Sequence, residues 1–192
     1  MIDQLLGEDA DLRQRALERL AALPEEARVA VATKLVPLAR DARDAFDFEA
    51  LERLLPALAR LKVDGARDYL LRLADEESVP LKTALVRALR GTDTRATRAV
   101  FLHLLSDPGM QAEAVLAIGE APWPGVLPDL IELAESSDAI ARVAIPGIVR
   151  CAAHGKDDAY AAYDFLTELL GDVRLRDEAR TALQELHRSE IL

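Results

Sequence analysis

Cys151 and His154 are the two residues of this sequence whose types and spacing come nearest to covalent chemistry. A thiol beside an imidazole is the arrangement of a nucleophile with its general base. Cys151, however, falls on the inward face of a predicted helix, seven residues after Ala144, and His154 comes near the end of that helix. A third group that would orient the histidine is missing. We therefore interpret Cys151 as a packed core residue and expect no catalytic residue.

A metal or cofactor site would need ligands at a spacing that one helix face or one loop can bring together. The three histidines, His103, His154 and His187, have no second histidine three or four residues away. Zinc sites draw on such clusters of histidine and cysteine. Glycine-rich phosphate loops follow a strand, and the sequence indicates no strand. We expect neither a metal nor a cofactor.

The charge and hydropathy of the chain exclude some classes of partner. The formal net charge is −10, and the arginines are scattered among acidic residues, so the phosphates of a nucleic acid would be repelled. No apolar run approaches the roughly 18 residues of a membrane span. Residues 1–20 show no basic leader or apolar stretch, so we expect no signal peptide, and a single cysteine fits a reducing compartment. We expect a cytoplasmic protein that binds a protein or peptide, with a basic surface as one option.

Alanine recurs along the chain in a regular way, and this regularity predicts helices. The interval is 30 to 35 residues, and the positions are Ala16, Ala50, Ala84, Ala114, Ala144 and Ala179. An apolar or small residue follows each alanine by four positions. Another precedes each by four positions: Leu12, Phe46, Pro80, Met110, Ile140 and Leu175. Positions four apart share one face of an α-helix, so we predict six equivalent helices.

Between these helices lie partner segments with apolar stripes of their own. We predict partner helices over residues 25–40, 65–75, 95–105, 124–135 and 157–170. Pro24, Asp47 and Thr94 stand where helix starts are expected. A two-helix unit of this length has too small a core to stand alone, so the units must stack on one another.

The array resembles HEAT repeats, particularly the short form first noted in phycobilisome lyases. The class tends to show a turn aspartate, then an arginine, then an alanine before an apolar stretch. The matching segments are 9–16, 138–144 and 172–179, whereas the units at 46–57 and 110–121 lack the arginine. The resemblance covers almost the whole chain. It implies an all-α fold, a right-handed α-solenoid (superhelix) of about six two-helix repeats, with residues 1–192 as a single domain.

Basic residues recur at fixed places relative to the alanines. One set lies two or three positions before them: Arg13, Lys82, Arg142 and Arg176. We expect this set to form a ladder between repeats with the turn aspartates, and a ligand-binding role is the alternative. A second set lies three positions after them: Arg19, Arg53 and Arg87. We expect that set to bridge neighbouring repeats as well.

Helical phase predicts where a partner would dock. Positions −1, +2 and +6 relative to each alanine point away from the apolar stripe. In the middle of the chain these positions hold apolar residues, namely Val86, Leu116, Val143 and Pro146, flanked by charged residues that include Arg90, Glu120 and Arg150. In HEAT stacks the second helix of each pair lines the concave side, as the resemblance implies. We therefore predict an apolar binding groove there, rimmed by charge. The alternative is that curvature buries these side chains.

Trp123 is a second candidate for partner binding. It lies between two prolines in a turn between helices. It is either an exposed anchor for a partner or a cap on the core between adjacent repeats.

These observations favour a protein interaction scaffold or adaptor that binds a partner protein or peptide, on its concave face. Two alternatives stay open. One is an accessory or lyase-like subunit of an enzyme system. The other is an acidic inhibitor or immunity-type protein that neutralises a basic partner.

Overall fold

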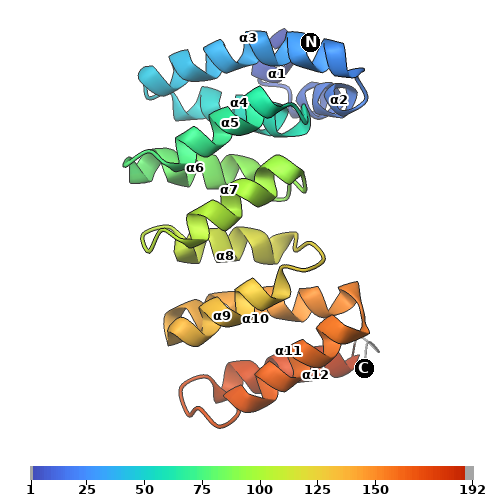
Figure 1. Cartoon of the computed structure of the whole chain (residues 1–192), viewed down its shortest axis with the longest axis vertical. Helices are drawn as coiled ribbons and strands as arrows, with labels where there is room; N and C mark the ends of the chain where they lie inside the picture. The colour runs from blue at the N-terminus through green and yellow to red at the C-terminus, as the bar shows by residue number, and fades with distance from the viewer. Residues whose placement is uncertain (1, 189–192) are drawn as a thin grey trace. The chain divides into compact units, whose positions relative to one another are not determined.

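The computed structural model describes residues 2–188, and within them the chain is all-helical, with no strand (Figure 1). The predicted all-α class is therefore confirmed. In chain order the helices are α1 (Ile2–Leu6), α2 (Ala10–Ala21), α3 (Glu25–Asp44), α4 (Phe48–Arg60), α5 (Asp64–Ala74), α6 (Val79–Leu89), α7 (Arg95–Leu105), α8 (Gln111–Glu120), α9 (Leu127–Ser136), α10 (Asp138–Cys151), the 3₁₀ turn η1 (Ala152–His154), α11 (Lys156–Leu169) and α12 (Arg176–Arg188). No helix of this part of the chain has the length and apolar character needed to cross a membrane.

The alanine repeat predicts the helices well. Its six alanines lie one each in α2, α4, α6, α8, α10 and α12. All but Ala50 are buried, and Ala50 is half-exposed because α4 buries the next residue, Leu51, in its place. The predicted partner helices are α3, α5, α7, α9 and α11, and the predicted helix over 95–105 is found to the residue.

The residues four positions before the alanines behave in two ways. Met110, Ile140 and Leu175 are buried as predicted. Leu12, Phe46 and Pro80 are exposed, so that part of the prediction is wrong. Phe46 shows the reason, because it precedes the start of α4 with φ at 54° and so lies on no helix face.

The helix starts are stabilised by the capping residues that the sequence indicates. The Asp47 carboxylate accepts a hydrogen bond from the backbone N–H of Ala50 at 3.0 Å. The Thr94 hydroxyl accepts one from Thr97 at 3.1 Å. Such caps satisfy backbone donors that the first turn leaves without a partner. The start of α9 lies later than predicted, at Leu127, because a turn through Gly125 with φ at 88° comes first.

The chain divides into two compact units, residues 1–110 and 111–192. In the first, α2 packs on α4 and α4 on α6, while α3 packs on α5 and α5 on α7. In the second, α10 packs against α8, α9, α11 and α12, and α9 contacts α11. Each unit thus has two layers, one of even-numbered and one of odd-numbered helices. The superhelix of six repeats and the single domain stay predictions.

Within the first unit, basic side chains link successive helices of the array. Three of the predicted basic residues make such contacts. Lys82 Nζ lies 2.6 Å from the turn carboxylate of Asp107, and Arg87 pairs with Glu52 at 3.0 Å. Arg53 donates to the backbone carbonyl of Leu6.

The predicted ladder is wrong for two other residues. Arg13 and Arg176 each donate to a backbone carbonyl six residues earlier, so they brace their own turn and reach no aspartate of a neighbouring repeat.

Within the second unit, Gly119 of α8 and Gly147 of α10 let two helix backbones meet. A Cβ atom added at Gly147 would lie 2.7 Å from the Cα of Gly119, closer than real Cβ atoms come to a backbone atom. Only glycine fits at this crossing. The contact fixes α8 against α10 and so sets the positions of the side chains that point away from it.

Candidate functional site

The predicted outward residues of the second unit do reach the surface. Leu116 of α8 is 38% exposed, Val143 of α10 is half-buried and Pro146 is exposed. The structure therefore places apolar side chains on the solvent side of α8 and α10, as helical phase predicts. Their role in binding a partner stays a prediction.

Two other candidate residues are buried, as the alternative interpretation of each one states. Val86 is only 1% exposed, because α6 packs against both α4 and α5 and buries Leu85, Val86 and Leu89. Trp123 is 8% exposed and lies in the turn that precedes α9. Its side chain is buried, so neither residue offers a surface for a partner.

The predicted charged rim is present in part. Arg150 is exposed at the end of α10, and its guanidinium donates a hydrogen bond to the backbone carbonyl of Gly119 on α8. Glu120, the next residue, is exposed at the end of the same helix. Leu116, Glu120, Val143 and Arg150 therefore gather on the α8–α10 pair. Arg90 lies in the first unit, at the end of α6, and is half-buried.

A groove that the sequence analysis missed adjoins this surface, between α10 and α12. It encloses about 590 Å³. Its α10 side consists of Arg142, Ile145, Pro146 and Val149, and its other side of Arg174, Asp177, Glu178, Thr181, Ala182 and Glu185. We refer to it as the α10–α12 groove. Glu178, Thr181 and Glu185 occupy positions −1, +2 and +6 around Ala179, so the same phase rule, applied to α12, could have found them.

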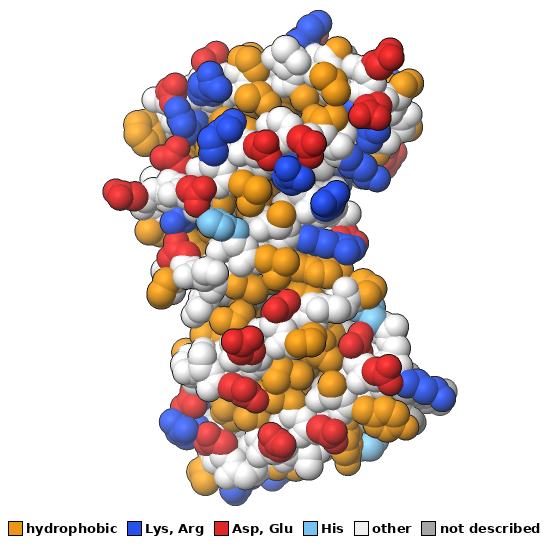
Figure 2. Space-filling view, in the orientation of Figure 1, with side chains coloured by type: hydrophobic (Ala, Val, Ile, Leu, Met, Phe, Trp, Pro, Cys, Tyr) orange, Lys and Arg blue, Asp and Glu red, His pale blue; other side chains and the backbone are white. Residues whose placement is uncertain are grey.

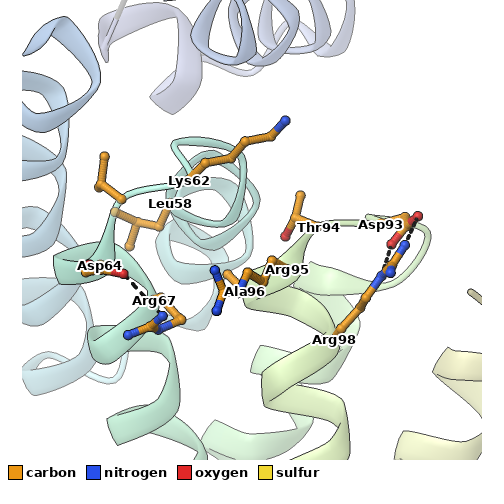
Figure 3. Close-up of a pocket in the computed structure, with 10 residues that line it drawn as sticks. Leu58, Lys62, Asp64, Arg67, Asp93, Thr94, Arg95, Ala96 and Arg98 are labelled. Atoms are coloured by element: carbon orange, nitrogen blue, oxygen red, sulfur yellow. Dashed lines mark hydrogen bonds and ion pairs between the residues drawn. The ribbon is translucent and has the colours of Figure 1, made fainter. Parts of the chain in front are cut away.

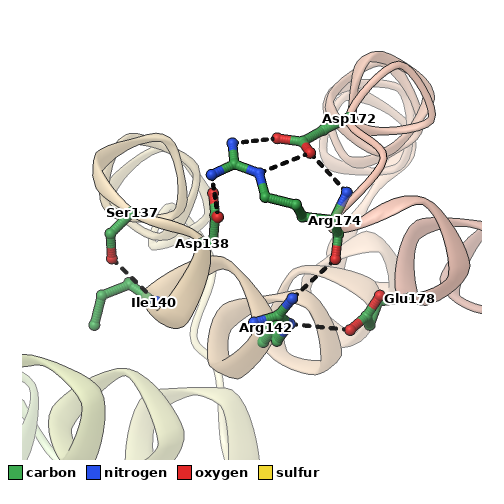
Figure 4. Close-up of polar contacts among 7 residues, drawn as sticks. All are labelled: Ser137, Asp138, Ile140, Arg142, Asp172, Arg174 and Glu178. Carbon is green, nitrogen blue, oxygen red and sulfur yellow. Dashed lines mark hydrogen bonds and ion pairs between the residues drawn. The ribbon is translucent and has the colours of Figure 1, made fainter.

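An ion-pair network holds the wall of the groove in place (Figure 4). Arg174, in the loop before α12, binds Asp138 at the start of α10 at 2.6 Å and Asp172 at 2.9 Å. Arg142 of α10 pairs with Glu178 at 3.1 Å and donates to the backbone carbonyl of Arg174 at 2.9 Å. These contacts join α10 to α12 at one end of the groove.

The pKa values of the network residues agree with this geometry. The hydrogen bonds from the Arg174 side chain and backbone lower the pKa of Asp172 below its ordinary value. A hydrogen bond from its own backbone N–H, and then Arg142, lower the pKa of Glu178. Both carboxylates are therefore charged near neutral pH, and they neutralise the two arginines of the groove.

Acidic residues dominate the unit that contains the groove. Residues 111–192 hold 15 of the 34 Asp and Glu but only 7 of the 24 Lys and Arg, which leaves them eight of the ten net negative charges. Figure 2 shows acidic side chains among hydrophobic ones over α9 and α11, on the face in view. In the groove Glu185 is exposed, and Asp177 forms an ion pair with the exposed Arg180. The groove therefore favours a cationic group.

The Cys151–His154 pair has no catalytic geometry. Cys151 is fully buried, as its inward phase predicts, and burial raises the pKa of its thiol to about 12. His154 is exposed in η1. Over residues 2–188, no three His, Cys, Asp or Glu side chains gather in a way that could hold a metal ion.

The first unit contains a different hollow, where α5 and α7 begin (Figure 3). It encloses about 570 Å³, and its charged lining residues are Lys62, Asp64, Arg67, Asp93, Arg95 and Arg98. Its charge is opposite to that of the α10–α12 groove.

Comparison with other proteins adds no assignment. No protein-family model, no curated protein and no solved structure matches this chain.

Proposed function

We propose that this chain is a HEAT-like repeat protein that binds a partner protein on the surface formed by α8, α10 and α12. We refer to this surface as the docking face. The observation that carries the proposal is the exposed Leu116 on α8, a helix that packs on α10, which in turn forms one side of the α10–α12 groove. Large apolar side chains that stay exposed in a rigid, concave setting are typical of interaction sites.

The energetics favour a partner that brings apolar side chains. Full burial of a leucine side chain contributes about 1.5–3 kcal/mol. Ile145 and Val149 are already mostly buried, so the floor of the groove is preorganised and loses little entropy on binding. A hollow of about 590 Å³ admits one or two side chains of a partner.

The charges favour a partner with basic residues beside its apolar ones. Glu113 and Glu120 flank Leu116 on α8, while Asp177 and Glu185 flank the groove on α12. Opposite charges around an apolar centre accelerate association and fix its orientation. A basic, apolar segment of another protein is therefore the ligand that suits this surface.

The repeat assignment is supported by the layers inside each unit. In both units a helix packs on the helix two places along the chain, and the repeat alanines of α2, α8 and α10 are buried. Stacking of this kind is how short two-helix repeats bury their cores. We propose that it continues through the chain as a superhelix.

Affinity capture from the native cell, followed by mass spectrometry, tests the proposal. The wild-type chain is compared with Leu116→Asp and with Leu102→Asp on α7, whose leucine is 40% exposed against 38% for Leu116. A charge at Leu116 should abolish recovery of the partner, because a carboxylate cannot be buried unpaired. Leu102→Asp should retain it, and both variants should keep the wild-type melting midpoint.

The proposal fails if Leu116→Asp recovers the same proteins as wild type. It also fails if both variants lose them equally, because the loss would then be unrelated to the docking face.

A further inference from the structure

The first unit has a groove whose charge is opposite to that of the docking face. Its first part is the hollow of about 570 Å³ where α5 and α7 begin (Figure 3). Its cations come from two segments: Lys62 and Arg67 from the start of α5, and Arg95 and Arg98 from the start of α7. Figure 2 shows basic and acidic side chains together over α5 and α7.

Half of these cations are already neutralised. Arg98 pairs with Asp93 through two hydrogen bonds, at 2.7 and 2.8 Å. Arg67 pairs with Asp64 at 3.1 Å.

Lys62 and Arg95 are exposed, and neither has an ion-pair partner among residues 2–188. Figure 3 shows the Arg95 side chain extending from α7 toward Arg67 on α5, so like charges converge in this hollow.

The helices themselves add to the positive potential. The N-cap of α5 is Val63, whose side chain cannot accept a hydrogen bond from the first backbone N–H groups, and Asp64 is the acidic residue of that first turn. The first turn of α7 contains two arginines and no acidic residue. Cations at a helix start are unfavourable to the helix because they oppose its dipole. Arg95 is therefore poorly placed for stability but well placed to receive an anion.

A second hollow, lined by Glu25 and Thr33 as well as by aliphatic side chains, continues the groove toward α3. It encloses about 540 Å³, shares Lys62, Val63 and Asp64 with the first hollow, and reaches Val29, Val36 and Pro37 of α3. Val29 is 49% exposed. The two hollows together offer a cationic end and an aliphatic end on one surface.

We propose that this groove binds an acidic segment of a partner protein. Its carboxylates bind Lys62 and Arg95, and its aliphatic side chains pack on Val29 and Val36. Two unpaired cations suit a short acidic segment. They do not suit a nucleic acid, because residues 1–110 carry 19 Asp and Glu against 17 Lys and Arg and would repel a long phosphate backbone.

The test measures fluorescence anisotropy of a short labelled peptide that alternates glutamate and leucine, titrated with the full chain. Arg95→Glu and Lys62→Glu should each weaken binding by about tenfold or more, as expected for a charge pair turned repulsive. Arg95→Gln should weaken it less. Arg15→Glu on α2 is the matched control, since Arg15 is also exposed and the change in net charge is identical. Circular dichroism verifies the fold of each variant.

Three results would overturn the proposal. The first is failure of the wild-type chain to bind the peptide. The second is an equal loss of binding in Arg15→Glu, which would mean that only net charge matters. The third is tighter binding of a single-stranded oligonucleotide than of the peptide.

Discussion

At the scale of single residues, burial and partners decide which side chains are available for function. Cys151 and Leu116 are both apolar in character and both lie on helices of the second unit. One is fully buried and the other is 38% exposed. The difference in access, rather than the residue type, makes Leu116 a candidate for binding and Cys151 a core residue.

The Cys151 thiol should be unreactive in the folded protein. Its pKa is raised to about 12 by burial, against an ordinary value of 9.0, so at pH 8 it is both protonated and inaccessible. A disulfide reagent at pH 8 should label it only after denaturant is added. Labelling of the native chain at the rate of a free thiol would contradict this account.

The same shift has a consequence for stability. Only the unfolded chain can ionise this thiol once the pH rises above about 9, so its contribution to the free energy of unfolding should fall from that pH upward.

Helical phase predicts the exposure of single residues only in part. It places Leu116 and Val143 on the surface because their own helices bury the alanine face. It fails at Val86, because two neighbouring helices cover α6 and the phase of one helix contains no information about its neighbours. Trp123 lies outside any helix, so phase says nothing of it.

At the scale of elements, the crossing of α8 and α10 positions the docking face. Gly147→Ala should destabilise the protein by about 1–3 kcal/mol, because its Cβ would meet the Gly119 backbone at 2.7 Å. Gly65→Ala on α5 is the control, since nothing lies within 4 Å of a Cβ there. Thermal denaturation followed by circular dichroism measures both. Equal melting midpoints would show that the helices do not cross so closely.

The sequence predicts most helices because their signals are local. Alanine spacing and capping residues place α2 to α12, with errors of a few residues at α3 and α9. It misses α1, which has five residues and is too short to show a period. It also misses the α10–α12 groove, because the wall of that groove depends on Arg174, a loop residue whose partner Asp138 lies at the start of another helix.

At the scale of the whole chain, charge divides the protein into two unlike units. The second unit carries eight of the ten net negative charges, while the first is nearly neutral and has a cationic groove. The net charge of the whole chain, −10, does not show this difference between the units. The two proposed binding surfaces agree with this difference in charge. The second unit would bind a basic partner, and the first would bind an acidic one.

The location of the docking face can be measured by amide hydrogen exchange of the chain, alone and with its partner. The partner is the protein that affinity capture recovers with the wild-type chain but not with the Leu116→Asp variant. The account predicts slower exchange on binding in residues 111–120, 142–150 and 174–185, with no change in residues 62–98. Protection confined to residues 1–110, with α8, α10 and α12 unaffected, would contradict it.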